Sequence, residues 1–135
     1  MGEPLNVYAP FVEAFLVVPF FVMGVSHVVQ ARMWRDFFVR LAERGEEAII
    51  VRSFMLELWP AVLIVTFHQV WRGPAAVLTL YGHLLCAKVA LAMVYPRVGM
   101  SSLKMAKTHG EGGFRKAGLV LIGLGGLCVW LVVSG

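Results

Sequence analysis

Charged residues are scarce in this chain. Of its 135 residues, 15% are charged and 59% are hydrophobic, and the mean hydropathy is +0.79. A typical soluble domain has about 25% charged residues, so this composition excludes an ordinary soluble fold and indicates an integral membrane protein surrounded by the lipid bilayer. A membrane-spanning helix needs about 20 residues. Four such helices and their loops use the whole length, and we therefore expect a single domain over residues 1–135.

Recognisable catalytic and cofactor motifs are also lacking. The two cysteines, Cys86 and Cys128, lie in apolar segments without CxxC spacing, and we expect them to pack as small apolar side chains. No HExxH, P-loop or nucleophile-elbow pattern occurs. The "GLGG" stretch at 123–126 follows no predicted strand, so together with Gly118 it favours close helix packing or an oligomer interface over a dinucleotide site. The sequence thus predicts no cofactor and no metal, and it leaves enzyme status open.

Lysine and arginine are absent before residue 32 and are then concentrated around two of the three loops. Those around the first loop are Arg32, Arg35, Arg40, Arg44 and Arg52, those around the third are Arg97, Lys104, Lys107, Arg115 and Lys116, and the second loop has Arg72. Cytoplasmic loops retain such positive charge, so we expect a bacterial inner-membrane protein with both termini outside. This topology accounts for the net charge of +4, and we expect no nucleic-acid partner. The N-terminal tail has no basic n-region and no small-residue cleavage site, so we expect the first span to be retained.

Four apolar segments are long enough to cross a bilayer. Their ranges are 8–29, 48–68, 74–95 and 114–134. A proline at position 74 suits the first turn of the third helix, and the proline at position 96 ends it. The glycine- and lysine-rich segment 97–116 is expected to be a mobile loop.

A shorter segment at 31–44 is amphipathic. Trp34, Phe37, Phe38 and Leu41 have the i, i+3, i+4, i+7 spacing of one helical face, with charged residues on the other side. We expect this helix to lie in the membrane interface; the alternative is an extension of the first span into the cytoplasm. The sequence therefore predicts an all-α integral membrane four-helix bundle with an interfacial amphipathic helix between helices 1 and 2.

Two residues of opposite charge lie well inside neighbouring predicted spans, Glu57 in the second and Lys88 in the third. A charged side chain at mid-membrane costs roughly 2.5–3.5 kcal/mol on insertion scales, so it normally faces protein or water. Counted from the inner boundaries at Arg52 and Pro96, their depths differ by less than one helical turn. We expect a direct or one-water ion pair, which is either a structural device that fixes helix register or a functional site.

A second polar group lies toward the outer face and consists of Glu13, His68 and His83. Two imidazoles and a carboxylate are able to bind a transition metal or to pass protons toward the inner pair. The alternative is that His68 is an interfacial residue and His83 a hydrogen-bonded core histidine. No metal site is predicted on this ligand chemistry alone.

The stretch "FHQVWRGPAAVLTLYGHLLCAKVALAMVYP" resembles a family of small uncharacterised four-helix bacterial membrane proteins. The matching positions are His68, Trp71, Thr79, Gly82, Lys88 and Pro96, and "GVSHVVQARMWRDFF" upstream is also similar. Gln69 and His83 depart from the family pattern, which has Asn and Trp there. The resemblance covers roughly two-thirds of the chain. It implies no known activity.

A second segment, "RSFMLELWPAVLIV", is similar to the membrane-associated eicosanoid and glutathione metabolism family through its arginine, Glu57 and Pro60. That resemblance implies a trimeric four-helix enzyme. Phe54 stands where the family has Asn, and the arginine-rich thiol-binding pattern of the family is not recognisable.

These observations favour an oligomeric or accessory membrane subunit, a homo-oligomer or part of a larger membrane complex, with a polar interior around Glu57, Lys88 and His83. Two other functions remain open. One is a proton-linked small-solute transporter that uses Glu13, His83, Glu57 and Lys88 in succession; the other is a glutathione- or lipid-modifying enzyme.

Overall fold

The computed structural model describes residues 6–135, and every element in this range is a helix. The elements are α2 (Ala9–Val29), α3 (Ala31–Glu43), α4 (Glu46–Arg52), the π-helix η1 (Ser53–Leu58), α5 (Trp59–Phe67), α6 (Ala75–Val94) and α7 (Pro96–Ser134). Residues 1–5, which belong to the N-terminal tail considered above, lie outside the described range.

Four helical stretches of the described chain are long and apolar enough to cross a membrane. They are Ala9–Val29, Glu46–Phe67, Ala75–Val94 and Pro96–Ser134. The first three agree with the predicted spans to within two residues at each end. Tyr95 has left the helical conformation (φ −125°, ψ 78°), as a following proline favours, so α6 ends at Val94 and Pro96 opens the next helix.

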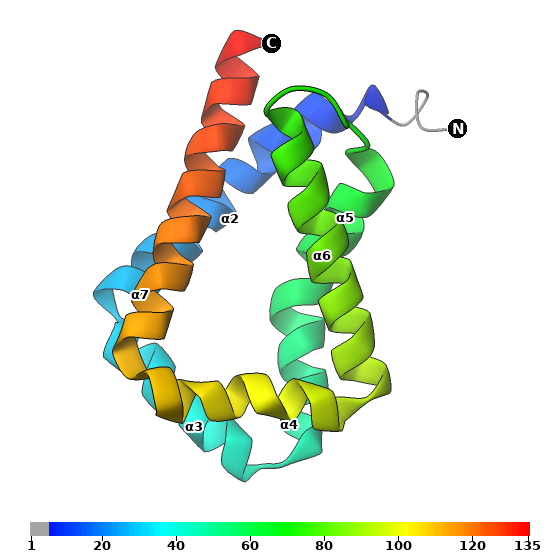
Figure 1. Cartoon of the computed structure of the whole chain (residues 1–135). Helices are drawn as coiled ribbons and strands as arrows, with labels where there is room; N and C mark the ends of the chain where they lie inside the picture. The colour runs from blue at the N-terminus through cyan, green and yellow to red at the C-terminus, as the bar shows by residue number, and fades with distance from the viewer. Residues whose placement is uncertain (1–5) are drawn as a thin grey trace.

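The helices form two pairs that meet at one end and diverge toward the other (Figure 1). Helix α2 packs along the second half of α7, and α5 together with η1 packs along α6. Near the two termini, α2 also contacts the α5–α6 pair through edge-to-face aromatic contacts. These are Tyr8 with Phe67 at 5.7 Å, Phe15 with Trp59 at 6.1 Å and Phe20 with Tyr81 at 5.8 Å between ring centroids. Beyond Phe20 the pairs separate, which leaves room for a cavity.

Glycine allows α2 and α7 to approach closely. A Cβ atom on Gly118 would lie 2.6 Å from the carbonyl oxygen of Gly24, and one on Gly125 would lie 3.1 Å from the ring of Phe21. The expectation of close packing by small residues is confirmed for these two positions. Gly123 and Gly126 instead face open space on the outer side of α7.

The wide end of the molecule is closed by a base of helices. It consists of α3, α4 and the first part of α7, which runs across the two pairs before a break at Gly110 (φ 57°, ψ −145°) (Figure 1). The segment 97–116 was expected to be a loop, and this expectation is wrong, since it is helical on both sides of that break. The buried residues Gly99, Leu103 and Ala106 share one face of the helix, and their burial against the base stabilises it.

Helix α3 occupies most of the segment 31–44 and is separated from α2 by a break at Gln30 (φ −108°, ψ 33°). Trp34 and Phe38 pack inward against Ala106 and Phe114 of α7, and the indole Nε1 of Trp34 donates a hydrogen bond of 2.8 Å to Ser26 Oγ. Phe37 is more exposed. A helix is therefore present where the amphipathic pattern predicts one; its place in a membrane interface stays a prediction.

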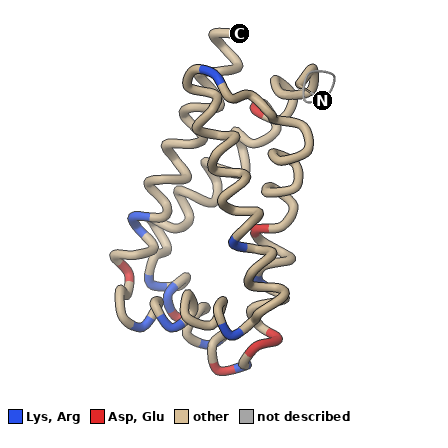
Figure 2. Tube along the Cα trace, turned by 45° about the vertical axis from the view of Figure 1, so that its right-hand side comes forward, with Lys and Arg blue, Asp and Glu red and all other residues tan. Residues whose placement is uncertain are grey.

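Charged residues gather at the base, the end opposite both termini, whereas the shafts of the four long helices carry few (Figure 2). Arg35 Nη1 of α3 lies 3.7 Å from Glu111 Oε1, just after the break in α7, and joins the base to the second part of α7. The outward faces of the shafts are apolar, with residues such as Phe11, Val22, Val77 and Val133 more than half exposed.

The close approach of α2 and α7 generates a first prediction. Gly118→Ala should lower the free energy of unfolding by about 1–3 kcal/mol, because the added methyl group meets backbone atoms that cannot rotate away. Gly126→Ala adds the same group in open space and should be neutral or stabilising by up to about 1 kcal/mol. Detergent-denaturation titrations followed by circular dichroism measure both. Equal effects of the two substitutions would contradict the observed packing.

Candidate functional site

A π-helical turn places two opposite charges side by side. Arg52 and Glu57 are five residues apart, and in an α-helix side chains at that spacing point about 140° away from each other. The turn Ser53–Leu58 is wider, with the i to i+5 pattern of a π-helix, and it brings Arg52 Nη2 to 3.4 Å from Glu57 Oε2. Pro60 follows this turn; it has no N–H for the carbonyl of Leu56, and its ring pushes that carbonyl aside. The wider turn accommodates both the missing N–H of Pro60 and the displaced carbonyl of Leu56.

Lys88 of α6 completes the charged cluster. Its Nζ lies 2.6 Å from Glu57 Oε1, so the direct ion pair expected from depth matching is present. Glu57 thus contacts one cation through each carboxylate oxygen. The Lys88 side chain is 50% exposed, against 18% for Glu57. The pair is therefore open on the Lys88 side and largely covered on the Glu57 side.

Arg52 is the buried member of the cluster, with only 4% of its side chain exposed. Nη1 lies 3.4 Å from Ser102 Oγ of α7, and the guanidinium carbon lies 5.6 Å from the ring centroid of Phe38. Within residues 6–135, Arg52 Nε and Ser53 Oγ are buried without a hydrogen-bond partner. The sequence placed Arg52 at the inner boundary of a span and among the charges of the first loop, and it did not predict its place in the charged cluster. The signal for it is Pro60, which disturbs the helical turn after Arg52.

The cluster lies on the wall of a cavity of about 640 Å³ between the two helix pairs. Leu16 and Phe20 line it on the side of the termini, and Met105 and Ala106 line it on the side of the base. Its walls are mostly apolar, and the cavity is partly open to the surface. Arg52, Glu57 and Lys88 therefore present charge at one wall of an otherwise apolar space.

His83 does not join this cluster. It is not among the described residues that line the cavity; its Nδ1 lies 2.9 Å from the backbone oxygen of Thr79 in its own helix, and its ring lies against Trp71, with centroids 5.1 Å apart. The idea of one polar interior around Glu57, Lys88 and His83 is therefore corrected. Residues 83 and 88 are five positions apart, whereas side chains on one face of a helix are three or four apart, so His83 and Lys88 point in different directions from α6.

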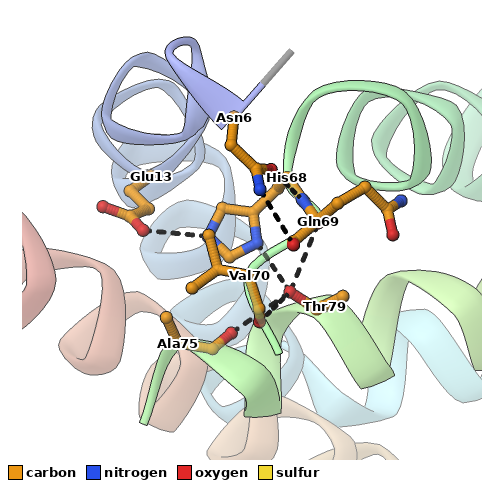
Figure 3. A network of polar contacts seen from close by, with 7 residues as sticks. All are labelled: Asn6, Glu13, His68, Gln69, Val70, Ala75 and Thr79. Atoms are coloured by element: carbon orange, nitrogen blue, oxygen red, sulfur yellow. Dashed lines mark hydrogen bonds and ion pairs between the residues drawn. The ribbon is translucent and has the colours of Figure 1, made fainter. Parts of the chain in front are cut away.

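The structure does bring Glu13 and His68 together, at the end of the molecule where the pairs meet (Figure 3). His68 Nε2 lies 2.8 Å from Glu13 Oε1 of α2, and His68 Nδ1 lies 2.9 Å from Thr79 Oγ1 of α6. His68 is fully buried. A hydrogen-bonded chain of three side chains thus joins α2, the loop after α5, and α6.

The Thr79 hydroxyl connects this chain to the segment between α5 and α6. Its Oγ1 lies 2.8 Å from the carbonyl oxygen of Val70 and 2.9 Å from His68 Nδ1. Each ring nitrogen of His68 therefore has a side-chain partner, as is usual for a buried polar group.

Neighbouring contacts fix the same end of the molecule. Asn6 exchanges two hydrogen bonds with the backbone of Gln69, of 3.0 and 2.7 Å (Figure 3). Leu16 and Ile64, one helical turn from Glu13 and His68, belong to the main apolar core. An apolar layer therefore lies between this polar chain and the cavity.

Glu13, His68 and His83 do not come together as a set of metal ligands. Across residues 6–135, no three His, Cys, Asp or Glu side chains come together in an arrangement able to hold a metal ion. Glu13 and His68 instead satisfy each other.

The Glu13–His68–Thr79 chain generates a second prediction. Glu13→Leu should lower the free energy of unfolding by about 1–3 kcal/mol, because it leaves a buried His68 nitrogen without a partner. Glu13→Gln is the matched control: its amide has both a donor and an acceptor for Nε2, so its loss should be much smaller. The same detergent-denaturation titration compares them. If Leu and Gln had the same effect, the hydrogen bond would not be what stabilises this end.

Comparison with models of known protein families, with curated proteins and with solved structures gives no significant match to this chain.

Proposed function

We propose that this protein is a small multi-pass membrane protein that binds an amphipathic small molecule in the cavity between its helix pairs. The observation that carries this proposal is the cavity of about 640 Å³, apolar on most sides and charged on one. Sites for small molecules have typical volumes of about 300–1,000 Å³, with mainly apolar walls and a few placed polar groups. The Arg52–Glu57–Lys88 cluster supplies the polar groups here.

The membrane part of the proposal rests on the outer surface. The four long helices expose apolar side chains to their surroundings, and a bilayer is the solvent that such surfaces require. Lipid exposure also gives a route for an amphipathic ligand, since the cavity is partly open between the helix pairs. The protein then acts as an oligomeric or accessory subunit, and its native mass in detergent tests that part of the proposal.

Orientation is the third prediction. The basic base should face the cytoplasm of a bacterial cell, with both termini outside, because positive charge is retained on the cytoplasmic side. After Cys86 and Cys128 are replaced by Ala, a membrane-impermeant maleimide added to intact cells should label Trp71→Cys and should leave Thr108→Cys unlabelled until the cells are opened. These two changes leave the loop charges intact. Labelling in the reverse order would overturn the orientation.

The fourth prediction tests binding. Dodecyl amphiphiles brominated at the chain end should quench the fluorescence of Trp59, which lines the cavity, in a saturable manner. Ala117→Phe places a ring in the cavity and should weaken binding roughly tenfold or more, which corresponds to about 1.4 kcal/mol. Leu119→Phe makes a similar addition on the exposed side of the same helix and should not weaken it.

A Trp59→Phe variant identifies the tryptophan that reports binding, since Trp34, Trp71 and Trp130 remain. The proposed function fails if amphiphiles of every head group give only non-saturable quenching, or if Ala117→Phe and Leu119→Phe behave alike.

A further inference from the structure

We propose, on the basis of the ligand-binding function above, that the cavity selects single-chain amphiphiles whose head group carries one negative charge. In this proposal, Glu57 determines how many negative charges the preferred head group carries. The preference follows from the balance of charges within the cluster. Arg52 and Lys88 contribute two positive charges, and Glu57 contributes one negative charge in contact with both. The cluster therefore has one positive charge in excess.

Lys88 has hydrogen-bond donors left for a ligand. It has three N–H donors, and the described residues accept one of them, at Glu57 Oε1. Half of its side chain is exposed, so an oxyanion can reach the free donors without displacing Glu57. Arg52 lines the same wall but is almost fully covered, and it contributes its positive charge.

No other group on the cavity wall supplies the missing negative charge. Glu57 is the sole carboxylate among the described residues that line the cavity. The remaining titratable side chains on the wall are His27, Tyr81 and His109. Nδ1 of His27 lies 2.7 Å from the backbone oxygen of Met23, and its ring stacks on Trp34, so it is held by its own neighbours.

The low polarity of the cavity walls favours a ligand that brings the net charge of the cluster to zero. An uncompensated charge in such surroundings is costly, so the most stable complex has no net charge at the cluster. A single negative charge on the ligand achieves this. A neutral head group leaves one positive charge, a dianion leaves one negative charge, and a cation raises the positive charge to two.

The apolar walls determine the rest of the ligand. A free monoanion would satisfy the cluster but leave the surfaces of Leu84, Val120 and Leu121 uncovered, whereas an attached alkyl chain buries them. We therefore assign the site to a chain-bearing monoanion, such as a carboxylate, sulfonate or phosphodiester amphiphile, and not to a soluble anion.

The experiment uses brominated dodecyl probes that differ only in head group. These are the sulfonate with one negative charge, the phosphate monoester, the neutral alcohol and the trimethylammonium. At about pH 8 the phosphate monoester carries close to two charges, because its second pKa is about 6. Purified full-length protein in an uncharged detergent should bind the sulfonate at least roughly tenfold more tightly than each of the other three. Methanesulfonate, the head group without a chain, should compete only weakly.

Three variants test the role of Glu57. Glu57→Gln raises the excess charge to two and should shift the preference toward the phosphate monoester. Lys88→Met removes the excess and should abolish the advantage of the sulfonate over the alcohol. The double variant Glu57→Gln with Lys88→Met again has one excess positive charge, from Arg52, and should regain the preference for the sulfonate. If Lys88 acted only through one specific contact with the ligand, the double variant would not regain the preference for the sulfonate.

The outcomes separate this inference from the proposed function. Saturable binding with the alcohol equal to or tighter than the sulfonate would overturn charge selection while leaving ligand binding intact. Effective competition by methanesulfonate would overturn the need for a chain. An unchanged head-group order in Glu57→Gln would overturn the role of Glu57. Circular dichroism and gel filtration check that each variant is folded, and the head-group series on the unaltered protein decides the charge selection even if a variant does not fold.

Discussion

Charge compensation among apolar helices is the constraint on which the rest of this structure depends. Glu57 contacts Arg52 with one carboxylate oxygen and Lys88 with the other, so a single acidic side chain connects the second helical stretch to α6. Arg52 in turn reaches Ser102 in the base. Because each of these charges would be costly alone among apolar neighbours, the three elements are held in one register.

Helix α2 connects the two helix pairs. Along one side it is joined to α7 by the close contact at Gly24 and Gly118, and near the termini it is joined to the other pair by the Glu13–His68 contact. These attachments lie at different heights along the helix. The two pairs therefore meet at one end and separate toward the base, and the cavity is the space that this divergence leaves.

The Glu13–His68–Thr79 chain and the Arg52–Glu57–Lys88 cluster both place polar side chains among apolar helices, but they differ in how these side chains are compensated. Glu13 and His68 are partners in a hydrogen bond and are enclosed by the apolar core. The Arg52–Glu57–Lys88 cluster retains an excess positive charge beside a cavity that is partly open. An enclosed, hydrogen-bonded pair is suited to holding helices together, whereas an uncompensated charge at an open wall is suited to attracting a ligand.

The sequence by itself determined the helical class, the bounds of the first three long helices and the pairing of Glu57 with Lys88, because these follow from hydrophobic length and from the cost of isolated charges. Only the tertiary structure decided that 97–116 is helical, that Arg52 belongs to the cluster, and that His68 pairs with Glu13 while His83 does not. These features depend on a local π-helical turn and on how far two helix pairs diverge. Neither is encoded in an α-helical periodicity, which assumes regular turns and says nothing of distances between helices.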